Sequence, residues 1–257
     1  MPEIRKVKLP QGFAWDLNVT SSTETAELTE KVWPRYLTEE SDLKDAPPQT
    51  KLSDAELFRR YCMWGIRSTN DHKLVALASA VHVPIDVSKS VLPDKGWHAA
   101  IEAYYSEFEP NCFCLLSANV DPDYRQLKFS YALLEQAKEL AQGFGFRTMI
   151  APVRPSIKEQ FSNISIEEYL DKRSDSGEFF DPWLRTHLNL GGEILNICSQ
   201  SVAIKATLAK WREWTGQELK ESGEYLLPMG LVPLKVDTDA NRGIYCEPNV
   251  WVRYRLK

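Results

Sequence analysis

Residues 111–153 constrain the fold more than any other part of the chain. They begin with the nearly apolar run NCFCLLSANV, which is typical of a strand buried on both faces. From Phe129 onward, apolar residues recur at spacings of three and four, which predicts an amphipathic helix. Gly143 and Gly145 end that helix, and FRTMIAPV predicts a second strand. Strand, turn, helix and strand together predict a βαβ unit with a parallel pair and a right-handed crossover.

The rest of the chain predicts further strands and helices around this unit. Strands are expected at 13–19, 73–87, 193–204, 231–236 and 243–256, and helices at 21–36, 55–66, 96–108, 182–190 and 205–216. The polar stretch 38–54, with its adjacent prolines, predicts a loop. We find no internal repeat. The fold class is therefore predicted to be α/β, with a mixed central sheet flanked by helices in one domain, 1–257. Its core spans about 73–206, with an N-terminal helical elaboration (1–72) and a C-terminal strand extension (207–257).

Composition excludes several classes of protein. The net charge is −5, the pI is about 5.5 and Lys and Arg form no run, which argues against a nucleic-acid partner. No apolar stretch approaches the ~18–20 residues that span a bilayer, so no membrane partner is expected. The N-terminal residues lack the apolar core of a signal peptide. A cytoplasmic protein is therefore expected.

Cysteine and histidine spacing predicts no metal site. The five cysteines include no CxxC pair, and the four histidines form no HExxH motif. We expect the cysteines to be buried and reduced.

The turn in the βαβ unit, DYRQLKFS, contains no glycine. A helix N-terminus still offers unpaired N–H groups and a partial positive charge, which suffice to bind a phosphate without any side-chain charge. Arg125 and Lys128 would add charge of the right sign. From these residues alone, either a phosphate cradle or a simple turn is possible.

The residues from Val120 to Ser130 resemble the acyl-CoA-binding motif of the GNAT superfamily of N-acyltransferases, V-x-P-x-Y-R/Q-x-x-G-x-G/A. In that family, N–H groups of the turn hold the pyrophosphate of CoA. The resemblance implies a GNAT-like fold, acetyl-CoA or another acyl-CoA as co-substrate, and seven cofactor-binding residues: Val120, Arg125, Gln126, Leu127, Lys128, Phe129 and Ser130. Lys128 and Ser130 stand where the family usually has two small residues. The lysine therefore either makes the cradle shallower or reaches the phosphates itself.

A second resemblance lies between Asp181 and Gly191. The pattern D-P-x-L-R-x-H-x-x-x-G is similar to a GNAT subgroup that includes GNAT-like domains of polyketide synthases and GNAT domains fused to nitrilase-like enzymes. It places His187 where many family members have the tyrosine that protonates the departing CoA thiolate. An unperturbed imidazole pKa of about 6.5 suits such an acid. A helix histidine that binds a neighbouring carbonyl is the alternative.

Arg154 is the second candidate catalytic residue. It follows a predicted strand, and strand ends in open α/β sheets border ligand crevices. Its guanidinium would orient a carboxylate or a phosphate. The alternative is a loop arginine without a ligand.

The resemblance implies an acyl-CoA-dependent transferase, with N-acetyl transfer to a small-molecule amine by direct attack on the thioester as the main hypothesis. One alternative is S-acyl transfer or decarboxylation of an acyl group on an acyl carrier protein, as the histidine implies. The other is a non-catalytic GNAT fold that binds acyl-CoA. The oligomeric state, including the possibility of an oligomer, is left open by the sequence.

Overall fold

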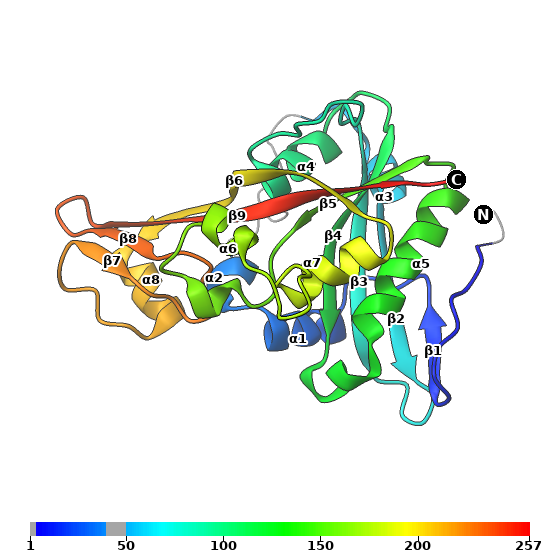
Figure 1. The fold of residues 1–257 in the computed structure, drawn as a ribbon, viewed down its shortest axis with the longest axis horizontal. Coiled ribbons are helices and arrows are strands. Elements are labelled where there is room, and N and C mark those ends of the chain that lie inside the picture. The colour runs from blue at the N-terminus through cyan, green and yellow to red at the C-terminus, as the bar shows by residue number, and fades with distance from the viewer. Residues whose placement is uncertain (1–3, 40–49) are drawn as a thin grey trace.

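The computed structural model describes residues 4–39 and 50–257. Its strands form one sheet in the order β1-β2-β3-β4-β5-β9-β8-β7, and β6 also pairs with β9 (Figure 1). The strands are β1 Phe13–Asp16, β2 Tyr61–Ser68, β3 Leu74–Val83, β4 Cys112–Val120, β5 Thr148–Val153, β6 Glu193–Thr207, β7 Gly223–Tyr225, β8 Leu234–Asp237 and β9 Arg242–Arg255. Within the described residues the β4–β5 pair is parallel and the other strand pairs are antiparallel. The predicted mixed α/β fold is confirmed.

Helices cover both faces of this sheet. The α-helices are α1 Thr23–Val32, α2 Arg35–Thr38, α3 Asp54–Arg60, α4 Gly96–Tyr104, α5 Phe129–Gly143, α6 Ile166–Asp171, α7 Pro182–Asn189 and α8 Leu208–Thr215. Two 3-10 helices, η1 Pro122–Leu127 and η2 Lys158–Phe161, follow β4 and β5. Residues 40–49 of the predicted loop lie outside the described residues. No helix in the described ranges has the length and apolar character needed to cross a bilayer.

The side-chain alternation of β3 shows which helices share a face. Leu77 packs in a cluster with Leu28 of α1, and Val81 packs in a cluster with Ala100 of α4. Because residues 77 and 81 are four apart on a strand, they point to the same side. The alternate residue Ala78 packs in the cluster that holds α5 and α7. The sheet therefore has an α1–α4 face and an α5–α7 face.

The predicted βαβ unit is present as β4, η1, α5 and β5. The apolar stripe of α5 is buried, including Leu133, Ala137 and Leu140. The helix ends at Gly143, and Gly145 follows with a φ of 88°. Glycine suits this left-handed position because it has no Cβ.

One helix prediction was wrong. The helix expected over 55–66 ends at Arg60, and residues 61–68 form β2, which pairs with β1 and β3. This segment contains Tyr61, Trp64 and Ile66, which fit a pleated sheet well. Apolar spacing alone does not separate a short buried strand from a helix, and tertiary pairing decided between them here.

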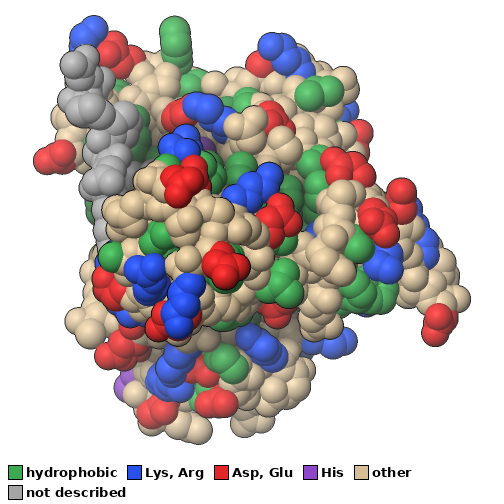
Figure 2. Space-filling model, turned by 90° about the vertical axis from the view of Figure 1, so that its left-hand side faces the viewer, with side chains coloured by type: hydrophobic (Ala, Val, Ile, Leu, Met, Phe, Trp, Pro, Cys, Tyr) green, Lys and Arg blue, Asp and Glu red, His purple; other side chains and the backbone are tan. Residues whose placement is uncertain are grey.

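Strands from outside the predicted core join the same sheet. β1 and β2 extend it beyond β3, and β9 pairs with β5 along Thr148–Val153. Residues 202–247, here called the C-terminal lobe, contain α8, β7, β8 and the paired ends of β6 and β9. This lobe projects away from α5 (Figure 1), and basic and acidic side chains are interspersed over that end of the molecule (Figure 2). The division into core and extensions stays a proposal.

Candidate active site

The parallel strands β4 and β5 separate along their length. Register pairs join Phe113 to Met149 and Cys114 to Ile150, yet β4 continues to Val120 and β5 to Val153. A bulge in β4 accompanies the separation, because Leu115 and Ser117 face successive residues of β3 and residue 116 has no partner there. The C-terminal halves of β4 and β5 thus border an opening in the sheet with backbone groups that β4–β5 pairing does not use. We call this the β4–β5 opening.

The turn after β4 is a 3-10 helix followed by one left-handed residue. The Asp121 carboxylate accepts from the Asp123 N–H at 3.2 Å and caps η1. Lys128 then has φ 57° and ψ 31°, a conformation that favours glycine. This explains why a small residue is usual at this point of the motif. The Lys128 side chain is exposed.

The N-terminus of α5 offers free donors at this turn. The N–H groups of Tyr131 and Ala132 donate to the Lys128 carbonyl at 3.1 and 3.3 Å. Those of Phe129 and Ser130 have no acceptor among the described residues. Within the described part of the chain, no side chain caps α5. Two orphan donors at a helix N-terminus are a site for an anion.

The other predicted cofactor-binding residues near this N-terminus differ in burial and in their contacts. Val120 and Leu127 pack against the core on the α5–α7 face. Arg125 is exposed, and Gln126 donates from Nε2 to the Asp123 carbonyl at 3.0 Å. The Phe129 ring is buried in the core, so its backbone rather than its side chain would meet a ligand.

Two lysines converge on the start of the turn. Lys31 of α1 and Lys73 contact the Asp121 carboxylate at 3.2 and 3.0 Å. Burial acts to raise the pKa of Asp121, but bonds from Lys73, the Asp123 amide and Lys31 outweigh it, so the pKa is lowered. This cluster carries a net charge of about +1, the sign that an anionic ligand at the turn requires.

His187 lies in α7 and is fully buried, with 1% of its surface exposed. Its Nδ1 is 2.6 Å from the Tyr254 hydroxyl, and its Nε2 has no partner among the described residues. Burial lowers the pKa of His187 to about 3, so the imidazole is neutral near pH 7. The cause is that α7 lies against the sheet and excludes water from the imidazole. A Cβ at Gly192 would lie 2.7 Å from Val252 and 2.8 Å from the His187 carbonyl, so glycine permits this close packing.

Arg154 lies where β5 ends, on the α1–α4 face. Its Nε donates to Glu247 Oε1 at 2.9 Å, and Nη2 donates to the Met229 carbonyl. The guanidinium lies over the Trp33 ring, 5.3 Å from its centroid. Burial acts to lower the pKa of Arg154, but the Glu247 carboxylate outweighs it and raises the pKa, so the group stays charged. His187 and Arg154 thus lie on opposite faces of the sheet.

Comparison with known proteins identifies the family of this chain. No protein-family model matches the chain. An arginine N-acetyltransferase, avaD of Aspergillus versicolor, is 30% identical over 247 residues, which cover 86% of this chain and 84% of that protein.

The chain belongs to the GNAT-type acyltransferases. Two solved structures show the same fold. The loading GNATL domain of CurA from Lyngbya majuscula has a TM-score of 0.57 at 15% identity, covering 95% of this chain and 97% of that one. The GphF GNAT-like decarboxylase in complex with isobutyryl-CoA has a TM-score of 0.51 at 19% identity, covering 91% and 94%.

The sequence analysis of this GNAT-type acyltransferase did not identify four residues at the site: Trp33, Asn119, Glu247 and Tyr254. Each meets a predicted residue or borders the β4–β5 opening only through tertiary contacts. The one local signal was Glu247, a carboxylate within the mostly apolar strand pattern YCEPNVWV. An acidic residue inside a buried strand requires a partner, and that partner is Arg154.

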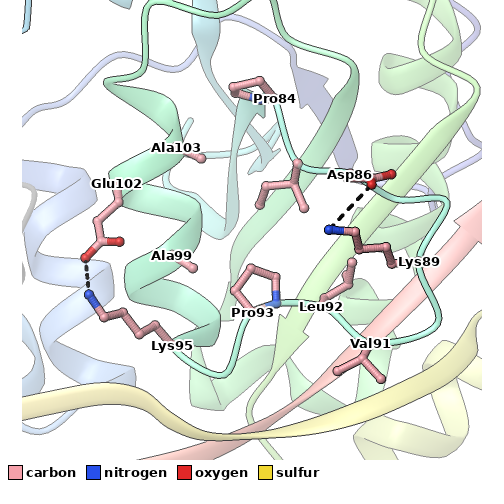
Figure 3. Close-up of a pocket in the computed structure, with 11 residues that line it drawn as sticks. Pro84, Asp86, Lys89, Val91, Leu92, Pro93, Lys95, Ala99, Glu102 and Ala103 are labelled. Atoms are coloured by element: carbon pink, nitrogen blue, oxygen red, sulfur yellow. Dashed lines mark hydrogen bonds and ion pairs between the residues drawn. The ribbon is translucent and has the colours of Figure 1, made fainter.

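A surface hollow elsewhere on the acyltransferase lies away from this site. Pro84, Ala99 and Ala103 are among the residues that line it, and so are the members of two ion pairs, Lys89–Asp86 and Lys95–Glu102 (Figure 3). It begins just after Val83, which pairs with Cys112 at the start of β4, whereas the turn follows the other end of β4. The hollow and the β4–β5 opening are therefore separate. Over residues 4–39 and 50–257, no cluster of three His, Cys, Asp or Glu side chains could hold a metal ion.

Proposed function

We propose that this protein transfers an acetyl group from acetyl-CoA to the amine of a small molecule. The observation that carries the proposal is the β4–β5 opening beside the two free N–H groups of Phe129 and Ser130. The relative from Aspergillus versicolor, named as an arginine N-acetyltransferase, supports an amine acceptor.

In this proposal the coenzyme lies against the turn and the opening. Backbone N–H groups near 125–130 hold the pyrophosphate, while Lys31 and Lys73 supply a favourable field. Backbone groups of β4 between Ala118 and Val120 meet the pantetheine. Acyl-CoA is thereby fixed along the border of the opening, which aligns the thioester for attack.

The acceptor amine attacks the thioester carbonyl directly. The new C–N bond forms, the C–S bond breaks, the sulfur departs as a thiolate and the amine proton passes to water. Alignment and polarisation of the carbonyl supply most of the acceleration.

The neutral state of His187 defines the role proposed for it. When Nδ1 accepts from the Tyr254 hydroxyl, Nε2 carries the hydrogen. Because Nε2 is buried, its hydrogen bond to the developing thiolate requires the coenzyme to displace the groups that cover it. The thiolate then takes its proton from water, because a neutral imidazole that lost its Nε2 hydrogen would become an imidazolate.

Isothermal titration with acetyl-CoA, followed by a thiol assay with an amine library that includes arginine, tests the proposal. Binding followed by CoA release on addition of an amine is the expected outcome. Binding without release from any amine would contradict N-acetyl transfer. His187→Ala should lower turnover while acetyl-CoA affinity is retained, and His72→Ala, an exposed site, serves as the matched control.

The alternative with a carrier protein is favoured by the histidine at position 187, as the sequence motif implies. In that case the substrate is an acyl group on a carrier-protein thiol. Release of carbon dioxide from malonyl-CoA, or acetylation of a carrier protein without amine acetylation, would favour it. The non-catalytic alternative predicts binding without turnover in both assays.

A further inference from the structure

Arg154 stands at the border of the β4–β5 opening, on the face opposite to α5. Asn119 lies on the part of β4 that has separated from β5, and it pairs with Leu77 of the α1–α4 face. Its Oδ1 accepts from Trp33 Nε1 at 2.7 Å. The Trp33 ring in turn lies against the Arg154 guanidinium. Trp33 therefore connects Asn119 of β4 with Arg154 at the end of β5, across the β4–β5 opening.

The guanidinium is held in one orientation from two sides. Glu247 of β9 is 1% exposed and binds Nε, while Met229 of the C-terminal lobe binds Nη2. The other oxygen of Glu247 accepts from the Tyr245 hydroxyl at 2.6 Å. Because both partners, Glu247 and Met229, belong to the C-terminal lobe, the side chain is fixed by the protein before any ligand binds. Such pre-organisation lowers the entropy lost on binding.

One edge of this guanidinium remains unused. Nη1 has no hydrogen-bond partner within the described residues, and 12% of the side chain is exposed. Nη1 therefore keeps its N–H donors on a fixed, partly desolvated cation, and a carboxylate oxygen is the acceptor that such a charged donor binds most strongly. The phosphates of the coenzyme do not explain it, because the free donors of α5 lie on the opposite face.

We propose that Arg154 determines acceptor specificity by binding a carboxylate of the acceptor, so that the acceptor is an amino acid with a free carboxyl group. This inference rests on the proposed amine acetylation and adds the class of acceptor. Glu247 is the positioning residue that orients Arg154, and Trp33 covers the guanidinium face. The carboxylate at Nη1 would hold the amine of the same molecule at the opening, where the thioester lies.

Calorimetry on the protein saturated with CoA tests the inference without turnover. The probes are L-arginine, L-lysine and L-glutamine, each as the free acid and as its C-terminal amide. We expect at least one acid to bind about 10- to 150-fold more tightly than its amide, the factor expected for a charge-assisted hydrogen bond. If no acid binds better than its amide, the inference is overturned.

Variants separate Arg154 from other sources of such a preference. Arg154→Gln alone leaves Glu247 buried and unpaired, so the double variant Arg154→Gln/Glu247→Gln removes both charges together. It should bind acid and amide equally while retaining its affinity for CoA, which reports on folding. Arg255 has an exposed side chain and lies on β9, the strand that carries Glu247, so Arg255→Gln should keep the preference for acids over amides. A preference that survives in the double variant contradicts the proposal.

An acetyl-transfer assay with the same probes distinguishes the hypothesis of carboxylate recognition from that of amine acetylation. Equal rates with acids and amides would overturn carboxylate recognition and leave amine acetylation standing. Preferential binding of acids without any acetyl transfer would instead contradict the amine acetylation and support the carboxylate site.

Discussion

Lys128 adopts a left-handed backbone conformation at the point where the turn meets α5. A residue with a Cβ in this conformation costs about 1–2 kcal/mol relative to the right-handed region. The N–H groups of Phe129 and Ser130, which follow this residue, have no acceptor among the described residues. The donors are backbone groups, so glycine is not needed to supply them.

Replacing Lys128 should separate backbone strain from side-chain charge. Lys128→Gly is expected to raise the free energy of unfolding by about 1 kcal/mol, which corresponds to about 2–4 °C in Tm for a chain of this size. Lys128→Ala removes the ammonium group but keeps the Cβ, so it should give no such gain. Urea and thermal denaturation measure both. Equal stabilisation by the two variants would contradict the strain.

The same variants report on the coenzyme. If backbone donors carry the affinity, acetyl-CoA should bind both variants about as tightly as it binds the native protein. A similar loss in both variants would instead show that the lysine contacts a phosphate.

The buried histidines predict a loss of stability in mild acid. The folded-state pKa of His187 is about 3, and burial with Arg60 nearby lowers that of His82 to about 4. In the unfolded chain a histidine pKa is about 6.5, so between these values the unfolded state binds more protons. The free energy of unfolding should therefore fall as pH decreases below 6.5, by at most about 1.4 kcal/mol per pH unit for each histidine.

Urea denaturation at pH 7.0, 6.0 and 5.0 measures this slope. The window lies above the ordinary pKa values of Asp and Glu, about 3.9 and 4.3. His187→Asn should reduce the slope, whereas the exposed His72→Asn should leave it unchanged. A slope that His187→Asn does not alter would contradict the neutral buried state.

At the scale of single elements, α7 depends on its N-cap. The Asp181 carboxylate is 1% exposed and accepts from the N–H groups of Trp183 and Leu184 at 2.9 and 3.0 Å. It also accepts from the Ile157 N–H and the Tyr169 hydroxyl. One side chain thus fixes α7, which carries His187, to the segment that follows β5.

Removing this cap should destabilise the site as well as the helix. Asp181→Ala loses the capping bonds and leaves buried donors unpaired, so we expect a loss of about 2 kcal/mol or more. Asp181→Asn keeps one oxygen for the cap and should lose less. Urea denaturation measures both, and turnover should fall in the same order because α7 positions His187. An alanine variant as stable as the native protein would contradict the role of this cap.

Local signals predicted some elements well and others poorly. The α7 prediction succeeded because Asp181, Pro182 and Gly191 are start and stop signals within the helix itself. The α5 prediction succeeded for the same reason, through its apolar stripe and closing glycines. The helix prediction for residues 61–66 was wrong, because their strand conformation depends on pairing with β1 and β3 on either side.

At the scale of the whole molecule, the N-terminal helices join the sheet to the C-terminal lobe. Tyr36 of α2 is 1% exposed, and its ring packs against Trp211 and Tyr245 of the lobe. Its hydroxyl donates to the Pro228 carbonyl at 2.9 Å. An ion-pair network between Arg35, Glu213, Lys210 and Glu39 surrounds this contact. The segment that carries Trp33 is thus fixed at both ends.

Tyr36 should therefore influence both stability and acceptor binding. Tyr36→Ala leaves a cavity in the lobe, with an expected loss of about 3–5 kcal/mol. Tyr36→Phe loses one hydrogen bond, or about 1 kcal/mol. Urea denaturation followed by tryptophan fluorescence measures the losses. Tyr36→Phe should retain acceptor affinity, because the ring still anchors α2. Equal losses in both variants would contradict packing as the main contribution of the ring.

By itself, the sequence determined the βαβ unit, the α/β class and the resemblance to a family. The caps, the apolar periodicity and the motif of the turn all lie within short stretches, so no distant partner is needed to detect them. His187 and Arg154 were also recognisable as candidates by their positions in such stretches.

Only the tertiary structure decided how these candidates are arranged. Arg154 meets Glu247 and His187 meets Tyr254 because β9, which is distant in the sequence, pairs with β5. Burial against that strand also lowers the pKa of His187, a shift that depends on the removal of water from all sides. Partners and solvent exclusion arise from packing between distant segments, and no local pattern encodes them.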